Sequence, residues 1–159
     1  MRYLLVDRIL ELTPRQSLTA VKNLSLAEEY LADHFPGFPV MPGVLMLESL
    51  VQAAGWLIRH SEQFQPSTIL LKEARALKFN SFVAPGKTLT VHVTVKKQDG
   101  RYWDFQGTGT IEGESAVSAR LTLEAFNLAE RHPELASSDE VRRQAARELW
   151  GQIWMPPQA

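Results

Sequence analysis

The sequence predicts an α+β fold in which an antiparallel β-sheet wraps around one long buried helix. Residues 43–59 are almost wholly apolar, and a helix that is apolar on all sides is typical of a protein interior. After Pro66 the apolar residues recur at every second position instead, which indicates half-buried strands. Strands before one helix and a run of strands after it favour the α+β class. A helix with no polar face also favours a second subunit.

The first half of the chain is expected to hold strands, a short helical turn and then the long helix. Residues 4–24 predict a strand or a bent pair of strands with a turn near residues 13–15. Residues 25–31 predict a helical turn capped by Ser25. The loop at residues 36–42 is dense in proline and glycine. The helix that follows is expected to begin near Gly43 and end near Arg59, a length of about 25 Å.

The second half is expected to form an antiparallel meander. Strands are predicted at residues 72–79, 89–96, 101–111 and 116–126. The sequence Gln-Asp-Gly at residues 98–100 is typical of a hairpin turn.

The C-terminal segment predicts a separate amphipathic helix. Ser137 and Glu140 fit a capping box at its start. Its apolar positions then recur every four residues, at Val141, Ala145, Leu149 and Ile153. We therefore predict a main domain at residues 1–129 and a helical extension at residues 130–159. The extension is expected to pack on the main domain rather than to act as a lid or an interface element.

Composition excludes several classes of function. The 159 residues suit one domain, and the apolar and charged fractions of 45% and 22% are ordinary. A net charge of −1 provides no overall attraction to nucleic acid or anionic membranes. Without cysteine there is no disulfide and no thiolate chemistry.

Targeting and cofactor motifs are not expected either. Asp7 interrupts the first apolar run too early for a signal peptide, and Pro42 and Glu48 argue against a membrane span at residues 40–58. We therefore expect a cytoplasmic protein. The four histidines lack metal-ligand spacing, and neither a metal nor a cofactor is expected.

One histidine and one carboxylate stand out as candidates for proton transfer. His34 precedes the proline- and glycine-rich loop, whose backbone is closely specified, and histidine moves protons readily near neutral pH. Glu48 and Gln52 lie on one face of the long helix. They predict either a structural hydrogen-bonded pair or a glutamic acid oriented by an amide, with burial raising the pKa of Glu48. His34 and Glu48 are expected to face each other across a small pocket, within one chain or across a dimer.

The start of the long helix offers backbone donors. The amides of Gly43 and Val44 have no partner inside the helix and lie at the positive end of its dipole. Such amides are able to stabilise a carbonyl oxygen on which negative charge develops.

These residues together resemble a known family. His34-Phe-Pro-Gly37, Pro39-Val-Met-Pro-Gly-Val-Leu45, Glu48 and Gln52 closely resemble the motif of bacterial 3-hydroxyacyl-[acyl carrier protein] dehydratases of the FabZ type. The similarity covers residues 3–126. A glutamate at position 48 resembles the FabZ branch, because the related FabA branch has aspartate there.

The resemblance implies a hot-dog fold, an antiparallel sheet wrapped around the long helix. It also implies a homodimer with two active sites at the subunit interface, often assembled as a trimer of dimers. His34 and Glu48 would be catalytic and would come from different subunits. Val40 would hold the histidine through its carbonyl, Gly43 would donate its amide to the thioester carbonyl, and Gln52 would orient Glu48.

The implied reaction is dehydration of a 3-hydroxyacyl thioester to the trans-2-enoyl thioester. The implied partner is acyl carrier protein, an acidic protein that would need a local basic patch such as Lys72, Arg75 and Lys78. The alternatives are a hot-dog thioesterase or hydratase that acts on coenzyme A esters, and a non-catalytic acyl-thioester sensor. A sensor needs no pairing of a histidine with a buried carboxylate.

The chain departs from the family pattern at a few positions. Asp33 replaces a usual glycine, residues 27–29 replace Asn-Glu-Pro, residues 80–82 replace Arg-Arg-Pro, and Lys87 replaces an aspartate. None of these changes removes a candidate catalytic group. They bear on substrate range, carrier docking and assembly.

Overall fold

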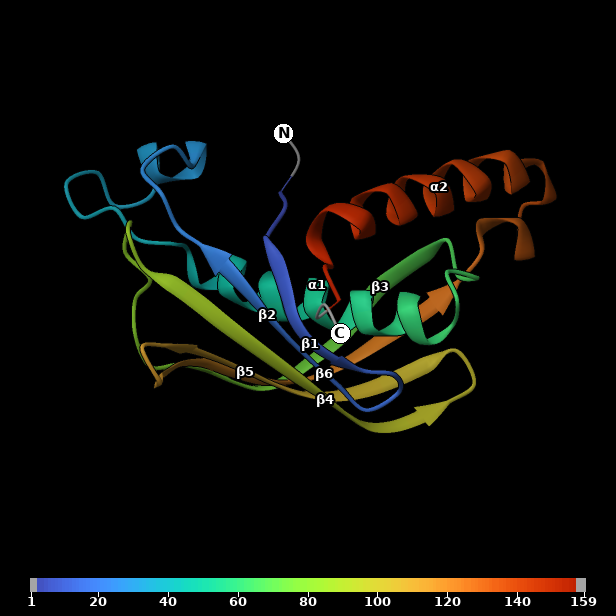
Figure 1. Cartoon of the computed structure of the whole chain (residues 1–159), viewed down its shortest axis with the longest axis horizontal. Helices are drawn as coiled ribbons and strands as arrows, with labels where there is room; N and C mark the ends of the chain where they lie inside the picture. The colour runs from blue at the N-terminus through green and yellow to red at the C-terminus, as the bar shows by residue number, and fades with distance from the viewer. Residues whose placement is uncertain (1–2, 157–159) are drawn as a thin grey trace.

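The structure is a computed structural model that describes residues 3–156. One antiparallel sheet holds six strands in the order β1-β2-β4-β5-β6-β3. The sheet curves around α1, and α2 lies beyond the C-terminal half of α1 (Figure 1). The strands are β1 Arg8–Thr13, β2 Ser17–Asn23, β3 Thr68–Phe79, β4 Thr88–Asp99, β5 Tyr102–Ile111 and β6 Glu114–Phe126. The α-helices are α1 Gly43–Ser61 and α2 Ala136–Ile153, and the 3₁₀ helices are η1 Glu29–Ala32, η2 Leu128–Glu130 and η3 Pro133–Leu135.

Most predicted elements are confirmed. The pair β1 and β2, the long helix and the meander β4-β5-β6 lie where the periodicity placed them, and Gly100 turns the β4–β5 hairpin with φ of 58°. The alternation places one face of each meander strand against α1. Leu50, Leu57, Val91 and Trp103 are buried in the shared core.

A glycine in β5 accommodates a close approach of helix and sheet. A Cβ atom on Gly107 of β5 would lie 3.2 Å from Cδ1 of Leu50 on α1. This is tighter than normal packing, so a larger residue at position 107 would require the Leu50 side chain to shift.

Three local expectations are wrong. The turn after β2 is η1, which begins at Glu29 without a side-chain cap, while the Ser25 hydroxyl accepts only the Ala27 amide, at 3.2 Å. Strand β3 begins at Thr68, four residues before its expected start at residue 72. The helix α1 is not buried on all sides, because the sheet covers one side of it; Val44 in its first turn is 68% exposed.

The start of α2 also differs from the expectation. No side chain caps its first turn, and the predicted capping box at Ser137 is absent. A capping box instead joins Asn127 and Glu130 around η2. Of the expected apolar face, Ile153 is buried, but Val141 is 69% exposed, because the sheet and α1 lie only against the C-terminal part of the helix.

Aromatic contacts attach α2 to α1. The Trp150 ring stacks on His60, with 5.1 Å between the ring centroids, and lies 5.9 Å from the ring of Trp56. A division into residues 1–129 and 130–159 stays a prediction, and its outer ends at residues 1–2 and 157–159 lie outside the described residues. Between residues 3 and 156, no helix has the length and hydropathy needed to cross a bilayer.

A buried carboxylate holds the other end of α2. Asp139 is 1% exposed and accepts hydrogen bonds from the Ser67 hydroxyl and from the amides of Leu128 and Ala129, the latter two at 2.9 Å. Burial alone would raise the pKa of Asp139. The Ser67 bond, the two amide bonds and the charge of Arg143 outweigh this and hold the pKa below its ordinary value.

This lowered pKa predicts an acid sensitivity of the fold. The ionised Asp139 stabilises the folded state above the unfolded-state pKa of 3.8, and the contribution is lost as the pH falls through the lower folded-state pKa. We therefore expect the Tm of Asp139→Asn to lie well below that of the wild type at neutral pH, with the gap narrowing in acid. Circular dichroism recorded during thermal unfolding, from neutral to acidic pH, measures this difference in Tm. Glu140→Gln, at an exposed neighbour, is the control, and a gap that does not depend on pH would contradict the prediction.

Candidate active site

His34 is held by a backbone carbonyl. Its Nδ1 lies 2.9 Å from the carbonyl oxygen of Val40, and the ring is half-buried. A carbonyl oxygen only accepts, so Nδ1 carries the proton in this bond and Nε2 has a free lone pair. A histidine in this tautomer is suited to take a proton at Nε2.

The loop that holds His34 is anchored at its far end. Val40 is buried, and the Met41 amide donates to the Val83 carbonyl at 2.9 Å. Inside the loop, Phe35 adopts φ of 51° and Gly37 adopts φ of 92°. A non-glycine residue in the left-handed region is uncommon, and the tight turn beside His34 is therefore closely specified by its backbone.

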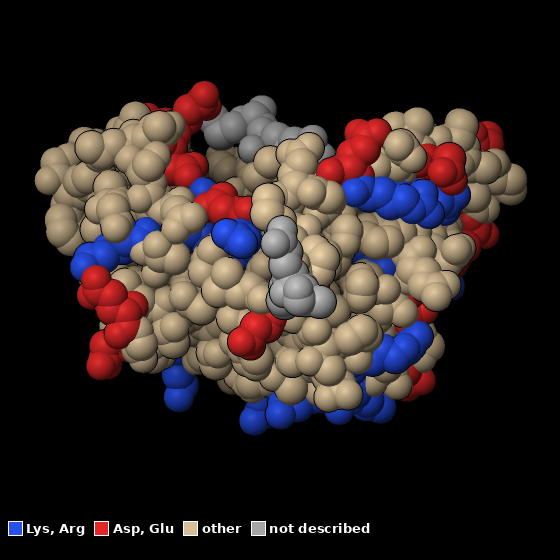
Figure 2. Space-filling view, viewed as in Figure 1, with Lys and Arg blue, Asp and Glu red and all other residues tan. Residues whose placement is uncertain are grey.

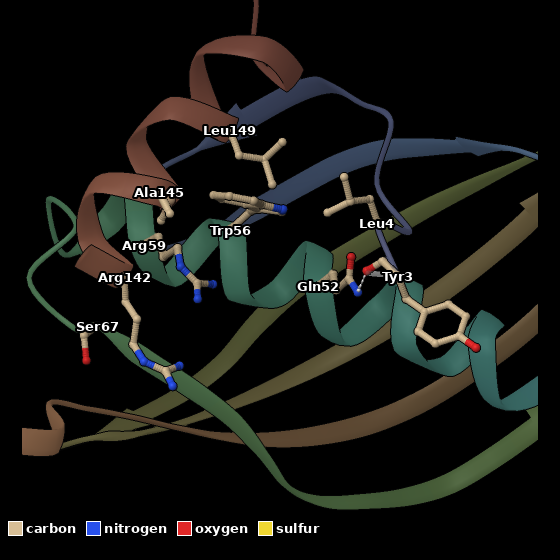
Figure 3. A pocket seen from close by; sticks show the side chains of 10 residues that line it. Tyr3, Leu4, Gln52, Trp56, Arg59, Ser67, Arg142, Ala145 and Leu149 are labelled. Atoms are coloured by element: carbon tan, nitrogen blue, oxygen red, sulfur yellow. Dashed lines mark hydrogen bonds between the residues drawn. The ribbon is translucent and has the colours of Figure 1, made fainter. Parts of the chain in front are cut away.

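Glu48 is oriented from within α1. Its Oε1 accepts a hydrogen bond of 3.1 Å from Nε2 of Gln52, one helical turn later. Gln52 also binds the N-terminal segment, since its Oε1 accepts the Leu5 amide at 2.9 Å and its Nε2 donates to the Tyr3 carbonyl at 3.0 Å (Figure 3). The amide of Gln52 is therefore fixed on both sides, and Glu48 keeps its second oxygen for other partners.

The first amides of α1 are free donors in a confined place. Within the described residues, the amides of Gly43 and Val44 have no acceptor. A Cβ atom on Gly43 would lie 3.1 Å from the ring of Phe79 at the end of β3. Glycine at position 43 therefore lets the helix start and the Phe79 ring approach each other closely.

One chain does not bring the whole site together. Between residues 3 and 156, no hydrogen bond joins His34 to Glu48, and each side chain is bound only to its own local partner. In Figure 2, acidic side chains lie over η1, and much of the outer surface of the lobe that η1 and the following loop make up is formed by uncharged residues. Large apolar side chains are exposed near these elements: Phe35, Phe38, Val44, Phe79 and Phe82.

The basic residues expected to dock a carrier are partly neutralised. Lys72 lies 3.5 Å from Glu124, and Arg75 lies 3.6 Å from Glu73. Within the part of the chain that the structure describes, Lys78 has no ion-pair partner. The three residues are exposed on the edge strand β3 but present less net charge than their sequence suggests.

The structure adds residues that the sequence analysis missed. The backbone groups of Tyr3 and Leu5 bind the Gln52 side chain. Backbone groups are the same in almost every residue, so no pattern of side chains in the sequence could have indicated these partners. Among residues 3–156, no three His, Cys, Asp or Glu side chains gather in a way that would hold a metal ion.

Comparison with known proteins connects this geometry to one family. The model of the FabA-like domain matches residues 1–120. The 3-hydroxyacyl-[acyl-carrier-protein] dehydratase FabZ of Levilactobacillus brevis is 44% identical over 120 residues, which cover 76% of this chain and 81% of that protein. The FabZ of Rickettsia massiliae is 39% identical over 121 residues, or 76% and 83% of the two chains.

A solved structure supports the fold. The dehydratase heterocomplex ApeI:P from Xenorhabdus doucetiae aligns with a TM-score of 0.68 at 18% identity, over 84% of this chain and 90% of that one. At this identity the likeness concerns the fold alone. Together with the family match, it confirms the expected hot-dog fold.

Proposed function

Because this chain belongs to the FabA-like family, among the FabZ-type 3-hydroxyacyl-[acyl carrier protein] dehydratases, we propose that it dehydrates its substrate through His34 and Glu48. It is a hydro-lyase of fatty acid biosynthesis. The bond between Nδ1 of His34 and the Val40 carbonyl carries the proposal for the residues, because it leaves Nε2 free to act as a base.

The proposed reaction moves two protons and breaks one carbon–oxygen bond. Nε2 of His34 takes the proton from the carbon next to the thioester carbonyl. The Gly43 amide, with the Val44 amide beside it, stabilises the negative charge that develops on the carbonyl oxygen. Glu48 donates a proton to the departing hydroxyl group, which leaves as water, and the double bond forms between the two carbons. Return of the histidine proton to the carboxylate restores the enzyme.

A complete site would need two subunits. His34 and Glu48 are not joined within one chain, and the exposed apolar side chains around them favour burial against another copy. The edge strand β3 also exposes Leu70, Leu71 and Leu77 and has a free row of backbone groups. We therefore propose a homodimer with two shared sites, which a trimer of dimers would extend.

The proposed substrate is the acyl chain on an acyl carrier protein, as the names of the relatives state for those proteins. The exposed positions Lys72, Arg75 and Lys78 on β3 remain the proposed docking patch. A cytoplasmic location is part of the same proposal.

The reaction can be tested because dehydration leaves the thioester intact, whereas a thioesterase releases a free thiol. Incubation with a 3-hydroxyacyl thioester is expected to increase absorbance at the enoyl-thioester band without release of free thiol. A coenzyme A thioester and the carrier-bound thioester are compared in parallel. Thiol release without enoyl absorbance would instead indicate a thioesterase and contradict the proposal.

A further inference from the structure

A separate cavity lies between α1 and α2, away from His34. Its volume is about 280 Å³, and residues of α1, α2 and the N-terminal segment line it (Figure 3). Leu4, Trp56 and Leu149 give it apolar walls. Pockets for drug-sized ligands span about 300–1,000 Å³, so this cavity suits a smaller molecule.

Two arginines without a carboxylate partner line this cavity. Nε of Arg59 on α1 is buried and has no hydrogen-bond partner within the described residues, and the guanidinium lies over the Trp56 ring, with Cζ 5.3 Å from its centroid. Burial lowers the pKa of Arg59. Arg59 as a whole is half-buried, and a cation that is partly removed from water without an anion is costly, so this position favours a negatively charged occupant.

Arg142 reaches the cavity from the opposite helix. Figure 3 shows its side chain extending from α2 into the gap beside Arg59. Its neighbours on α2 find a carboxylate: Arg143 lies 3.0 Å and Arg147 lies 3.7 Å from Glu140. Among residues 3–156, Arg142 forms no ion pair. The cavity therefore gathers two unneutralised guanidinium groups from two helices.

Two other polar side chains of the wall, Ser67 and Gln52, already have partners. The Ser67 hydroxyl donates to Asp139, and the Gln52 amide binds Tyr3, Leu5 and Glu48. The Tyr3 ring points away from Arg59 and Arg142 in Figure 3, so the two arginines are the donors left for a ligand between the helices. Two guanidinium groups suit one small carboxylate, and the apolar walls suit a short hydrocarbon chain attached to it.

We propose that the cavity between α1 and α2 binds a small amphipathic carboxylate, with the carboxylate on Arg59 and Arg142 and the hydrocarbon chain against Leu4, Trp56 and Leu149. This site does not depend on the dehydration chemistry. Because its ligand would contact residues of both helices, binding would hold α2 against α1.

Titration with sodium hexanoate tests the proposal directly. Trp56 lines the cavity, so tryptophan fluorescence of the full chain is expected to change to saturation. Arg59→Met and Arg142→Gln are each expected to raise the Kd at least about tenfold. Arg147→Gln, on the same helix but paired with Glu140 and outside the cavity, is expected to bind like the wild type.

Further ligands separate the two parts of the proposed chemistry. Hexanol, which lacks the charge, and inorganic phosphate, which lacks the chain, are expected to bind more weakly than hexanoate. Phosphate binding as tight as that of hexanoate would overturn the proposed ligand class. If hexanoate bound at the dehydration site instead, its Kd would be the same for the wild type and both arginine variants. That result would overturn the proposed binding site.

Thermal stability keeps the test independent of folding. Arg59→Met replaces a half-buried unpaired cation with an apolar side chain, so its Tm is expected to equal or exceed that of the wild type without ligand. A large loss of Tm in Arg59→Met, together with unchanged hexanoate binding in Arg142→Gln, would mean that the arginines serve the fold alone.

Discussion

Replacement of His34 by alanine is expected to lower kcat/KM for dehydration by about 10²–10⁴-fold, the usual contribution of a general base. The half-buried ring bonds only to the Val40 carbonyl, so its loss leaves the core intact. The Tm is therefore expected to change little. His92→Ala is the matched control, because His92 is exposed on β4, where its ring bonds to threonine hydroxyls. Near-normal turnover of His34→Ala would remove His34 from the mechanism.

Glu48→Gln tests the acid separately. Glutamine keeps the size and the bond to Gln52 but has no proton to donate to the leaving hydroxyl, so a loss of similar size is expected. If His34 handles both protons, Glu48→Gln would retain most of its rate while His34→Ala loses it. Glu62→Gln, at the C-cap residue that follows Ser61 of α1, is the control for a general effect of charge.

The main elements of the fold could be predicted from the sequence because their patterns are periodic. The alternation along β4 predicts which face of the strand is buried, and the apolar run of α1 predicts a buried helix. Neither pattern identifies the element that packs against it. The exposed Val44 escaped this reasoning because exposure depends on how far the sheet extends around the helix. Periodicity therefore predicts an apolar helix, but it does not predict which residues of that helix the sheet covers.

Long-range polar contacts explain the errors near α2. Ser137 and Glu140 satisfy the local pattern of a capping box, yet the carboxylate that matters in this turn is Asp139. Its hydroxyl partner, Ser67, is 72 residues away in the chain. Whether the local motif or the distant contact forms depends on which residues the fold brings together, and the sequence pattern does not contain this information.

The local contacts of the candidate residues, His34 with Val40 and Glu48 with Gln52, were predictable for a different reason, while their catalytic roles stay a prediction. His34, Glu48 and Gln52 lie within 19 residues. The proline-rich loop and the helix that connect them restrict the positions that these side chains can take. The further role of Gln52 was not predictable, because it binds the backbone of Tyr3 and Leu5 rather than their side chains. Backbone partners have no residue type by which a sequence would reveal them.

Mixing two inactive variants is expected to restore activity if the site is shared between subunits. In a mixed dimer of His34→Ala and Glu48→Gln, one site would combine His34 of the second variant with Glu48 of the first. The other site would lack both groups. Two different affinity tags allow the mixed dimer to be purified, and its turnover is then compared with both parents.

The two possible arrangements of the site give opposite results in this experiment. With sites shared across a two-fold axis, each mixed dimer would have one intact site and about half of the wild-type activity. With both groups supplied by one chain, every site in the mixed dimer would lack either His34 or Glu48, and activity would stay at the level of the parents. The absence of any bond between His34 and Glu48 within the described part of one chain favours the first result. Mixed dimers as inactive as their parents would refute the shared site.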